Sequence, residues 1–282
     1  ICKFEPHYQM INEITSEISF TSFKEDVLKD YEIVCLSRAM SLLGRKEVLT
    51  GKAKFGIFGD GKELPQIAMA KAFQKGDFRS GYYRDQTFMM AIDCLTPQQL
   101  FAGLYAHTDP DQEPMSSGRQ MGGHYNTDLI DKNGTWLRQT DRYNSSSDVS
   151  CTAAQMPRLV GLAMASKLYR TETIFHDNKF SINGNEVAWG TIGNASTSEG
   201  LFFESLNAAG VHQIPMVISV WDDEYGISVD NSFQTIKGSI SEALTGFQRS
   251  KTKAGFEIFT VLGWDYPNLI HTFQKAGELA RN

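Results

Sequence analysis

The stretch that decides the fold is Val187–Tyr225, VAWGTIGNASTSEGLFFESLNAAGVHQIPMVISVWDDEY. Two runs rich in β-branched and aromatic residues, Val187–Ile192 and Pro215–Val220, flank a helical pattern at Glu199–Ala209. Strands that alternate with helices indicate a parallel sheet with helices on both faces. We therefore expect an α/β fold with a doubly wound, mostly parallel sheet.

Further elements are expected on both sides of this unit. Residues 23–45 have a mostly helical apolar spacing and predict an early amphipathic helix, and Tyr82–Gln86 is a polar loop or element end. Residues 107–151 form a long polar segment, which in a compact domain favours a functional loop. The other expected elements are helices at Glu63–Phe73, Pro97–Tyr105, Ala153–Lys167 and Pro267–Ala280 and a strand near Glu257–Val261.

The composition is that of a globular protein. The chain has 282 residues, of which 41% are hydrophobic and 21% charged, enough for a sizeable core. We expect a single domain over 1–282 with an N-terminal helical arm at about 1–50. Because the chain opens at Ile1 and stops at Asn282 inside an apparent helix, we interpret it as a fragment of a longer protein.

Charge, hydropathy and cysteine spacing argue against several partners and sites. A net charge of −6 without a basic block argues against nucleic acid. The absence of a long apolar run and of a signal-peptide pattern argues against a membrane or export, so we expect a cytoplasmic protein. The four cysteines form no Cys-x-x-Cys pair, which predicts reduced thiols rather than disulfides or a zinc site.

Chemistry is expected where the two strands end. Ligands of open parallel sheets bind beyond the carboxyl ends of the strands, which here are followed by Gly193–Ala195 and Trp221–Tyr225. Asn194 and Asp223 have the oxygen atoms that Mg²⁺ prefers when it bridges protein to phosphate. The blander interpretation is a common strand-helix unit with solvated acids at a strand end.

A capping box is predicted between these two strands. Ser196 and Glu199 have the spacing in which each side chain satisfies a free amide at a helix start, and Gly210 would close the helix. Such a helix start attracts an anionic phosphate.

The run Gly193–Ser228 resembles the thiamine diphosphate motif of the decarboxylating (E1) component of 2-oxo acid dehydrogenases, the branched-chain 2-oxoisovalerate and pyruvate dehydrogenase family. Asn194 stands where that family usually has an acid and Asp223 where it usually has Asn, so one carboxylate and one amide remain. The resemblance implies a thiamine-diphosphate-binding fold with Mg²⁺. Its implied metal ligands are Asn194, Asp223 and the Tyr225 carbonyl, and its cofactor contacts include Gly193, Asn194, Ala195 and Ser196.

The resemblance extends to the first half of the chain. Tyr83 and Arg84 match the pair that holds the diphosphate in alpha subunits, a task that suits the planar guanidinium fork. Gly118–His124 resembles a Gly-rich segment whose last residue, His124, lies near the reacting carbon of the cofactor and exchanges protons. Without the family, Arg84 is a surface or ion-pair residue and His124 a polar loop residue.

Two further segments bear on the resemblance. Ser150 and Thr152 match a turn that lines the cofactor, as contacts to cofactor or a structural cation, although hydroxyls at a helix start are also ordinary N-caps. Gly59-Asp60-Gly61 is a literal Gly-Asp-Gly but lacks a matching strand end downstream. We expect Asp60 to be a turn residue.

The resemblance also implies a reaction and partners. A 2-oxo acid would lose carbon dioxide, and the acyl group would pass to a lipoyl-bearing acyltransferase. The activating Glu of this family belongs to a beta-type subunit or half-chain, so we expect activity only in a hetero-oligomer, or in a homodimer of a fused chain. Which 2-oxo acid is used stays open.

Two alternatives come from other classes. A dinucleotide-binding oxidoreductase would need Gly-x-Gly-x-x-Gly after its first strand, which Gly193 does not begin. A non-catalytic assembly or regulatory module of the same fold stays open, because Asn194 replaces an expected acid. Binding of thiamine diphosphate separates these alternatives from the thiamine-dependent enzyme.

Overall fold

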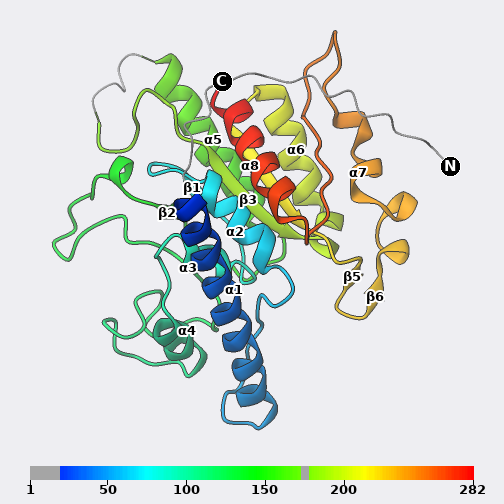
Figure 1. Ribbon diagram of the computed structural model, residues 1–282. Coiled ribbons are helices and arrows are strands. Elements are labelled where there is room, and N and C mark those ends of the chain that lie inside the picture. The colour runs from blue at the N-terminus through cyan, green and yellow to red at the C-terminus, as the bar shows by residue number, and fades with distance from the viewer. Residues whose placement is uncertain (1–19, 173–177) are drawn as a thin grey trace.

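A four-stranded parallel sheet lies at the centre of the computed structural model, which describes residues 20–172 and 178–282 (Figure 1). The order across the sheet is β2-β1-β3-β4, and each neighbouring pair is parallel. The strands are β1 (Phe78–Ser80), β2 (Asn144–Ser145), β3 (Ala188–Gly193) and β4 (Met216–Trp221). The predicted α/β class with a parallel sheet is confirmed.

The strand order creates a switch point beside β1. The chain moves from β1 to β2 on one side, while β3 and β4 lie on the other. Ser80 pairs with Gly190, and Gly193 pairs with Trp221, so β1, β3 and β4 end at one edge. Ligands of open α/β sheets bind at such a point.

Helices cover both faces of the sheet. The pair α5 and α6 packs on one face, and α2 and α8 pack together on the other (Figure 1). The helices are α1 (Phe20–Leu49), α2 (Glu63–Ala72), α3 (Gln86–Ala91), α4 (Pro97–Leu104), α5 (Gln155–Thr171), α6 (Gly200–His212), α7 (Ile240–Ala243) and α8 (Tyr266–Arg281). A small antiparallel pair, β5 (Tyr225–Gly226) and β6 (Val229–Asp230), follows β4. No helix within the described ranges is long and apolar enough to span a membrane.

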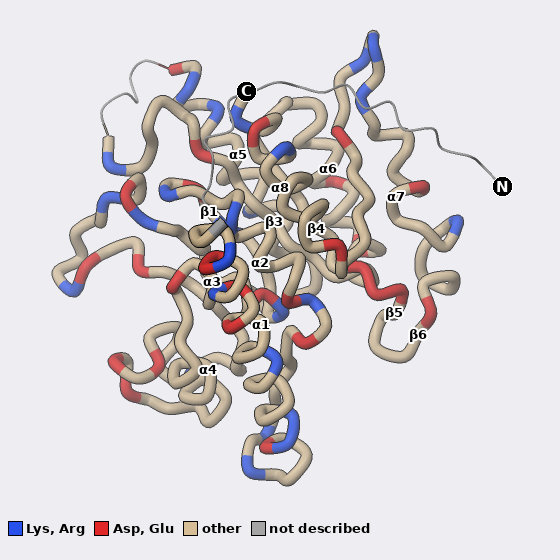
Figure 2. The backbone as a smooth tube through the Cα atoms, in the orientation of Figure 1, with Lys and Arg blue, Asp and Glu red and all other residues tan. Residues whose placement is uncertain are grey.

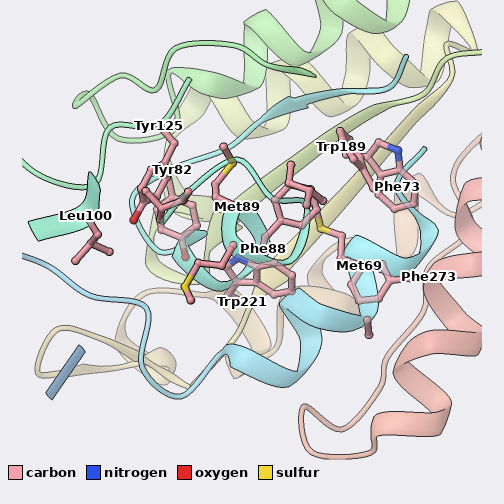
Figure 3. Packing of buried hydrophobic residues seen from close by; sticks show 14 of the residues in the cluster. Met69, Phe73, Tyr82, Phe88, Met89, Leu100, Tyr125, Trp189, Trp221 and Phe273 are labelled. Carbon is pink, nitrogen blue, oxygen red and sulfur yellow. The ribbon is translucent and has the colours of Figure 1, made fainter. Parts of the chain in front are cut away.

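Alternation along β3 and β4 divides the core into two clusters. Trp189 and Trp221 point to the α2 and α8 face, where Phe273 lies 6.5 Å and 6.4 Å from them between ring centroids (Figure 3). Ala188 and Ile192 belong to the cluster under α5 and α6. Successive side chains of a strand point to opposite faces, so this short sheet is buried on both sides.

The early helix is confirmed, but only part of its apolar spacing is buried, with Met40 in the core. In α1, Leu28 and Tyr31 are more than half exposed, whereas Asp30, Ser37 and Ser41 are buried. The buried serines make polar contacts, because the Ser37 hydroxyl lies 2.7 Å from that of Thr87 in α3. Residues 1–19 of the expected arm lie outside the described residues.

The expected strand at Glu257–Val261 is wrong. This segment forms no strand in the part of the chain that the structure describes, where its neighbourhood has only an isolated bridge between Gln248 and Phe256. A strand needs a ladder of backbone hydrogen bonds to a neighbour, and β4 remains an edge strand on this side. Apolar composition alone is therefore not enough to predict a strand here.

The predicted capping box at Ser196 is also wrong. Residues Ala195–Ser198 form a separate 3-10 turn, and α6 begins at Gly200 with Glu199 as an N-cap that makes no side-chain bond. The helix ends at His212, where Gln213 adopts a left-handed conformation in place of the expected Gly210. The 3-10 turn between β3 and α6 separates Ser196 from the start of the helix that it was expected to cap.

Candidate active site

Most of the sequence-predicted site residues follow the carboxyl ends of the four parallel strands, whereas His124 lies in the segment between α4 and β2. This arrangement depends on β1 and β2, two strands that the sequence reasoning missed because they are only three and two residues long. Tyr83 and Arg84 follow β1, Ser150 and Thr152 follow β2, Asn194, Ala195 and Ser196 follow β3, and Asp223 and Tyr225 follow β4.

Arg84 and Asp223 line one cavity. It has a volume of about 480 Å³ and also includes Arg45, Asp60 and Lys62 in its wall. The Arg84 guanidinium lies 5.4 Å from the centre of the Tyr83 ring and donates a long bond of 3.4 Å to the Phe58 carbonyl. Within the described residues Arg84 has no carboxylate partner, so it brings an unneutralised positive charge to the cavity.

Asp223 forms an ion pair with Lys62, a contact that the sequence reasoning missed. Lys62 directly precedes α2, and Asp223 belongs to the acidic run that leads from β4 into β5 (Figure 2). Asp60 is confirmed as a turn residue, and it accepts a 2.6 Å bond from Arg45. The only signal for Lys62 was its place in the turn before α2.

Buried polar atoms without partners gather around the Gly193 turn. Asn194 is 4% exposed, and its Nδ2 has no hydrogen-bond partner. The hydroxyl of Tyr82 is also unpaired, and it would lie 3.3 Å from a Cβ placed on Gly193. Buried polar groups are nearly always paired, so this cluster indicates a place where a polar ligand completes the bonding.

The turn at β5 packs against the segment that follows Gly193. A Cβ on Gly226 would lie 2.6 Å from the Cβ of Ala195 and 2.4 Å from Nε2 of Gln234. The Oε1 atom of Gln234 is another buried atom without a partner. The segments after β3 and β4 therefore meet, as predicted, although Asn194 Nδ2 has no hydrogen-bond partner and Asp223 is paired with Lys62 instead.

The Tyr82 phenol is held in its neutral form. Burial, followed by the nearby Asp85 carboxylate, raises its pKa well above the ordinary value. Desolvation disfavours the charged form of a tyrosine. Tyr82 is therefore a hydrogen-bond donor at any physiological pH.

His124 and Ser150 are brought together across the second part of the site. His124 Nε2 lies 2.7 Å from Ser150 Oγ, and His124 Nδ1 lies 2.8 Å from the Met121 carbonyl oxygen. Because a carbonyl only accepts, Nδ1 carries a proton, and neutral His124 accepts from Ser150 at Nε2. The pair can exchange a proton with a ligand.

Other predicted residues lie outside these two groups. Thr152 is exposed, Tyr225 is half exposed, and no hydrogen bond in the described residues links the Thr152 or Ser196 side chain to the cavity or to His124. Groups of three or more His, Cys, Asp or Glu placed for a metal do not occur within the described ranges. The predicted metal ligands are one amide, one carboxylate and one backbone carbonyl, so they would not form such a group.

A buried ionic network under the site was missed by the sequence reasoning. Asp85 accepts from Arg79 at 2.8 Å, from the Trp221 indole at 3.0 Å and from the Thr191 hydroxyl. Arg79 also pairs with Asp148, whose pKa is raised by burial despite Arg79. The network connects the ends of β1, β3 and β4. Its only signal in the sequence was an acidic residue, Asp85, next to Arg84.

The comparisons with known proteins identify the family of the chain. The family model described as the dehydrogenase E1 component matches residues 31–249. The chain belongs to this family. The E1 chain is 28% identical to the 2-oxoisovalerate dehydrogenase subunit alpha of Bacillus subtilis (strain 168), over 90% of this chain. It is 25% identical to the mitochondrial subunit alpha of that enzyme from Mus musculus, over 84% of this chain.

A relative named as a pyruvate dehydrogenase subunit matches as well. The pyruvate dehydrogenase E1 component subunit alpha of Acholeplasma laidlawii is 27% identical over 73% of the E1 chain. The matched regions span 68% of the Bacillus protein but only 47% and 48% of the Mus and Acholeplasma proteins. The family is that of thiamine-diphosphate-dependent 2-oxo acid dehydrogenases, and the chain is of its alpha type.

Proposed function

We propose that this E1 chain binds thiamine diphosphate and Mg²⁺ at the carboxyl edge of its sheet and takes part in the oxidative decarboxylation of a 2-oxo acid. One observation carries the proposal. Arg84 and Asp223, chosen from distant parts of the sequence as diphosphate and metal ligands, line the same cavity. Arg84 has no carboxylate partner in the described part of the chain, so an anion is its natural partner.

The residues present fit the cofactor group. Arg84 and the turn at Gly193–Ser196 would hold the diphosphate, and the unpaired Asn194 amide would gain a partner there. Asp223, Asn194 and the Tyr225 carbonyl offer the oxygen ligands that Mg²⁺ requires. Thr152 would line the cofactor beside Ser150, as the family resemblance implies.

The chain's own residues would orient the bound groups and move protons. Thiamine diphosphate supplies the electron sink for loss of carbon dioxide when it is bound. His124, whose Nδ1 is directed by the Met121 carbonyl, would move a proton at Nε2, and Ser150 fixes the ring from the other side. Tyr82 would donate its hydroxyl to an acceptor near Gly193.

The proposed partners follow from the family. Relatives of the E1 chain are named as alpha subunits, which supports a beta-type subunit or half-chain as the partner. The acyl group would pass to a lipoyl-bearing acyltransferase. The substrate would be a branched-chain 2-oxo acid or pyruvate, since relatives of both names match.

Isothermal titration calorimetry of the assembled protein tests the proposal. Thiamine diphosphate with Mg²⁺ should bind, and chelation of the metal should weaken this binding. The Lys62–Asp223 pair favours one other candidate, a non-catalytic module of the same fold, because it occupies a proposed metal ligand. Failure of thiamine diphosphate to bind the assembled protein at saturating Mg²⁺ would favour that candidate.

A further inference from the structure

We infer that Lys62 is a built-in cation of the cofactor site, which holds the Asp223 carboxylate in the cofactor-free protein and competes with the divalent metal for it. The inference rests on the proposed function for the identity of the anion. It adds a residue that the family motif does not include. It also predicts that metal binding and diphosphate binding depend on each other more strongly than two independent contacts would.

The position of Lys62 is fixed by the turn before α2. Its backbone nitrogen donates to the Gly59 carbonyl at 3.2 Å, and its carbonyl accepts from Gln66 at 3.4 Å in the first turn of α2. Glu63, the next residue, accepts from the Gly61 nitrogen at 2.9 Å and from Arg38 of α1 at 2.6 Å. The Lys62 side chain is therefore anchored at its base on a rigid part of the fold.

Burial makes the Lys62–Asp223 pair more than a surface contact. The Lys62 side chain is 11% exposed, whereas that of Asp223 is 41% exposed and faces the cavity. A lysine ammonium at this depth requires a counter-charge. Asp223 supplies it, and the acid is thereby neutralised in the absence of a ligand.

The other charges of the cavity leave Lys62 as the competitor for Asp223. Arg45 is bonded to Asp60 at 2.6 Å, and Arg84 lies against the Tyr83 ring. A divalent cation at Asp223 would sit beside the Lys62 ammonium, and like charges at such separations repel strongly in a partly buried site. The metal must therefore displace Lys62 from Asp223.

A released ammonium has a second partner in the proposed complex. Lys62 and Arg84 line the same cavity, and a lysine ammonium has three donors on a flexible stem, which suits it to phosphate oxygens. Diphosphate would therefore draw Lys62 away from Asp223 and leave the carboxylate free for the metal. Metal alone should bind weakly, and diphosphate should retain part of its affinity without metal.

Titration of Mn²⁺ alone into the cofactor-free assembled protein tests the competition. Free Mn²⁺ is measured by electron paramagnetic resonance for wild type, Lys62→Met, Lys62→Arg and Lys71→Met. Lys71 is the matched control, because it lies on α2 and pairs with Asp30 at 2.9 Å. Lys62→Met should bind Mn²⁺ about tenfold more tightly than wild type, whereas the other two variants should not.

Two further arms identify the site and the second role of Lys62. Adding Asp223→Asn to Lys62→Met should abolish the gain in Mn²⁺ affinity. With EDTA present, Lys62→Met should bind thiamine diphosphate about tenfold more weakly than wild type. Circular dichroism and the melting temperature show whether the variants fold, and Lys62→Gln serves if Lys62→Met does not.

The outcomes separate this inference from the proposed function. An unchanged or lower Mn²⁺ affinity in folded Lys62→Met, or the same gain in Lys62→Arg, would overturn the competition. Lack of thiamine diphosphate binding to wild type at saturating Mg²⁺ would instead overturn the proposed function. The Mn²⁺ arms do not depend on the cofactor, so each idea can fail alone.

Discussion

Arg79 and Asp148 are joined by two parallel hydrogen bonds of 3.0 Å, from the two terminal guanidinium nitrogens to the two carboxylate oxygens. Both side chains are almost completely buried. Asp148 also accepts from the backbone nitrogen of Tyr125, next to His124. This pair therefore connects the end of β1 to both segments that carry the His124–Ser150 contact.

Removing the guanidinium should be strongly destabilising. Arg79→Met leaves Asp85 and Asp148 buried without a cation, and breaking such a buried pair costs about 3–5 kcal/mol of unfolding free energy. Burial raises the pKa of the Asp148 carboxyl even beside Arg79, and without the guanidinium this pKa should rise further, so the buried carboxylate is relieved by protonation more readily as the pH falls. The loss should therefore be larger at neutral than at mildly acidic pH.

Chemical denaturation of Arg79→Met at several pH values measures this loss. Arg249→Met is the control, because Arg249 is half exposed and lies 3.9 Å from Glu257. A surface pair contributes at most about 1 kcal/mol. Equal losses in the two variants would contradict the structural role of the buried network.

Arg84 is expected to bind the diphosphate. Arg84→Ala should weaken thiamine diphosphate binding by roughly ten- to hundredfold, because a charged hydrogen bond contributes about 1.5–3 kcal/mol. Arg138→Ala is the control, since Arg138 is exposed and lies 3.9 Å from Asp141, outside the cavity. Calorimetry that gives the same affinity for both variants would remove Arg84 from the site.

Asn194 and Asp223 should act together if they share a metal. Asp223→Asn removes the only side-chain carboxylate of the proposed metal ligands, so Mg²⁺-dependent cofactor binding should fall sharply. Adding Asn194→Asp restores one carboxylate, and residues that share a ligand are not additive. The double variant should bind thiamine diphosphate better than Asp223→Asn alone in a Mg²⁺ titration, and purely additive effects would show that no metal is shared.

Tyr82→Phe should weaken cofactor binding without lowering stability. The Tyr82 hydroxyl is buried without a partner, and leaving such a group unpaired costs about 1–3 kcal/mol. The variant should therefore unfold at the same or a higher temperature, while thiamine diphosphate binds more weakly. A lower melting temperature with unchanged affinity would place the hydroxyl outside the cofactor site.

Cys94 should be the least reactive of the described thiols. Burial raises its pKa to about 11, and only the thiolate is alkylated. Cys35 and Cys151 are free and exposed. Iodoacetamide followed by peptide mass spectrometry should label Cys151 well before Cys94 near neutral pH, with Cys94 gaining reactivity as the pH rises toward 11. Equal rates would contradict the burial of Cys94.

The sequence by itself determined the β3-α6-β4 unit and predicted the edge of the sheet at which the candidate site lies. Local periodicity and the turn residues between elements are enough for this, because each strand and helix of the unit is long enough to show its own pattern. The same holds for α4, where Thr96 and Gln99 form a capping box. Asn194 and Asp223 could be chosen because they directly follow the two strands.

Only the tertiary structure decided which charges meet. Lys62 and Asp223 are 161 positions apart, and Arg79 reaches Asp148 from a strand of three residues that has no detectable period. The segment Glu257–Val261 has strand-like composition but gains no ladder. Ion pairs and strand ladders need a second group brought from elsewhere in the chain, and the order of the strands, which local patterns do not encode, selects that group.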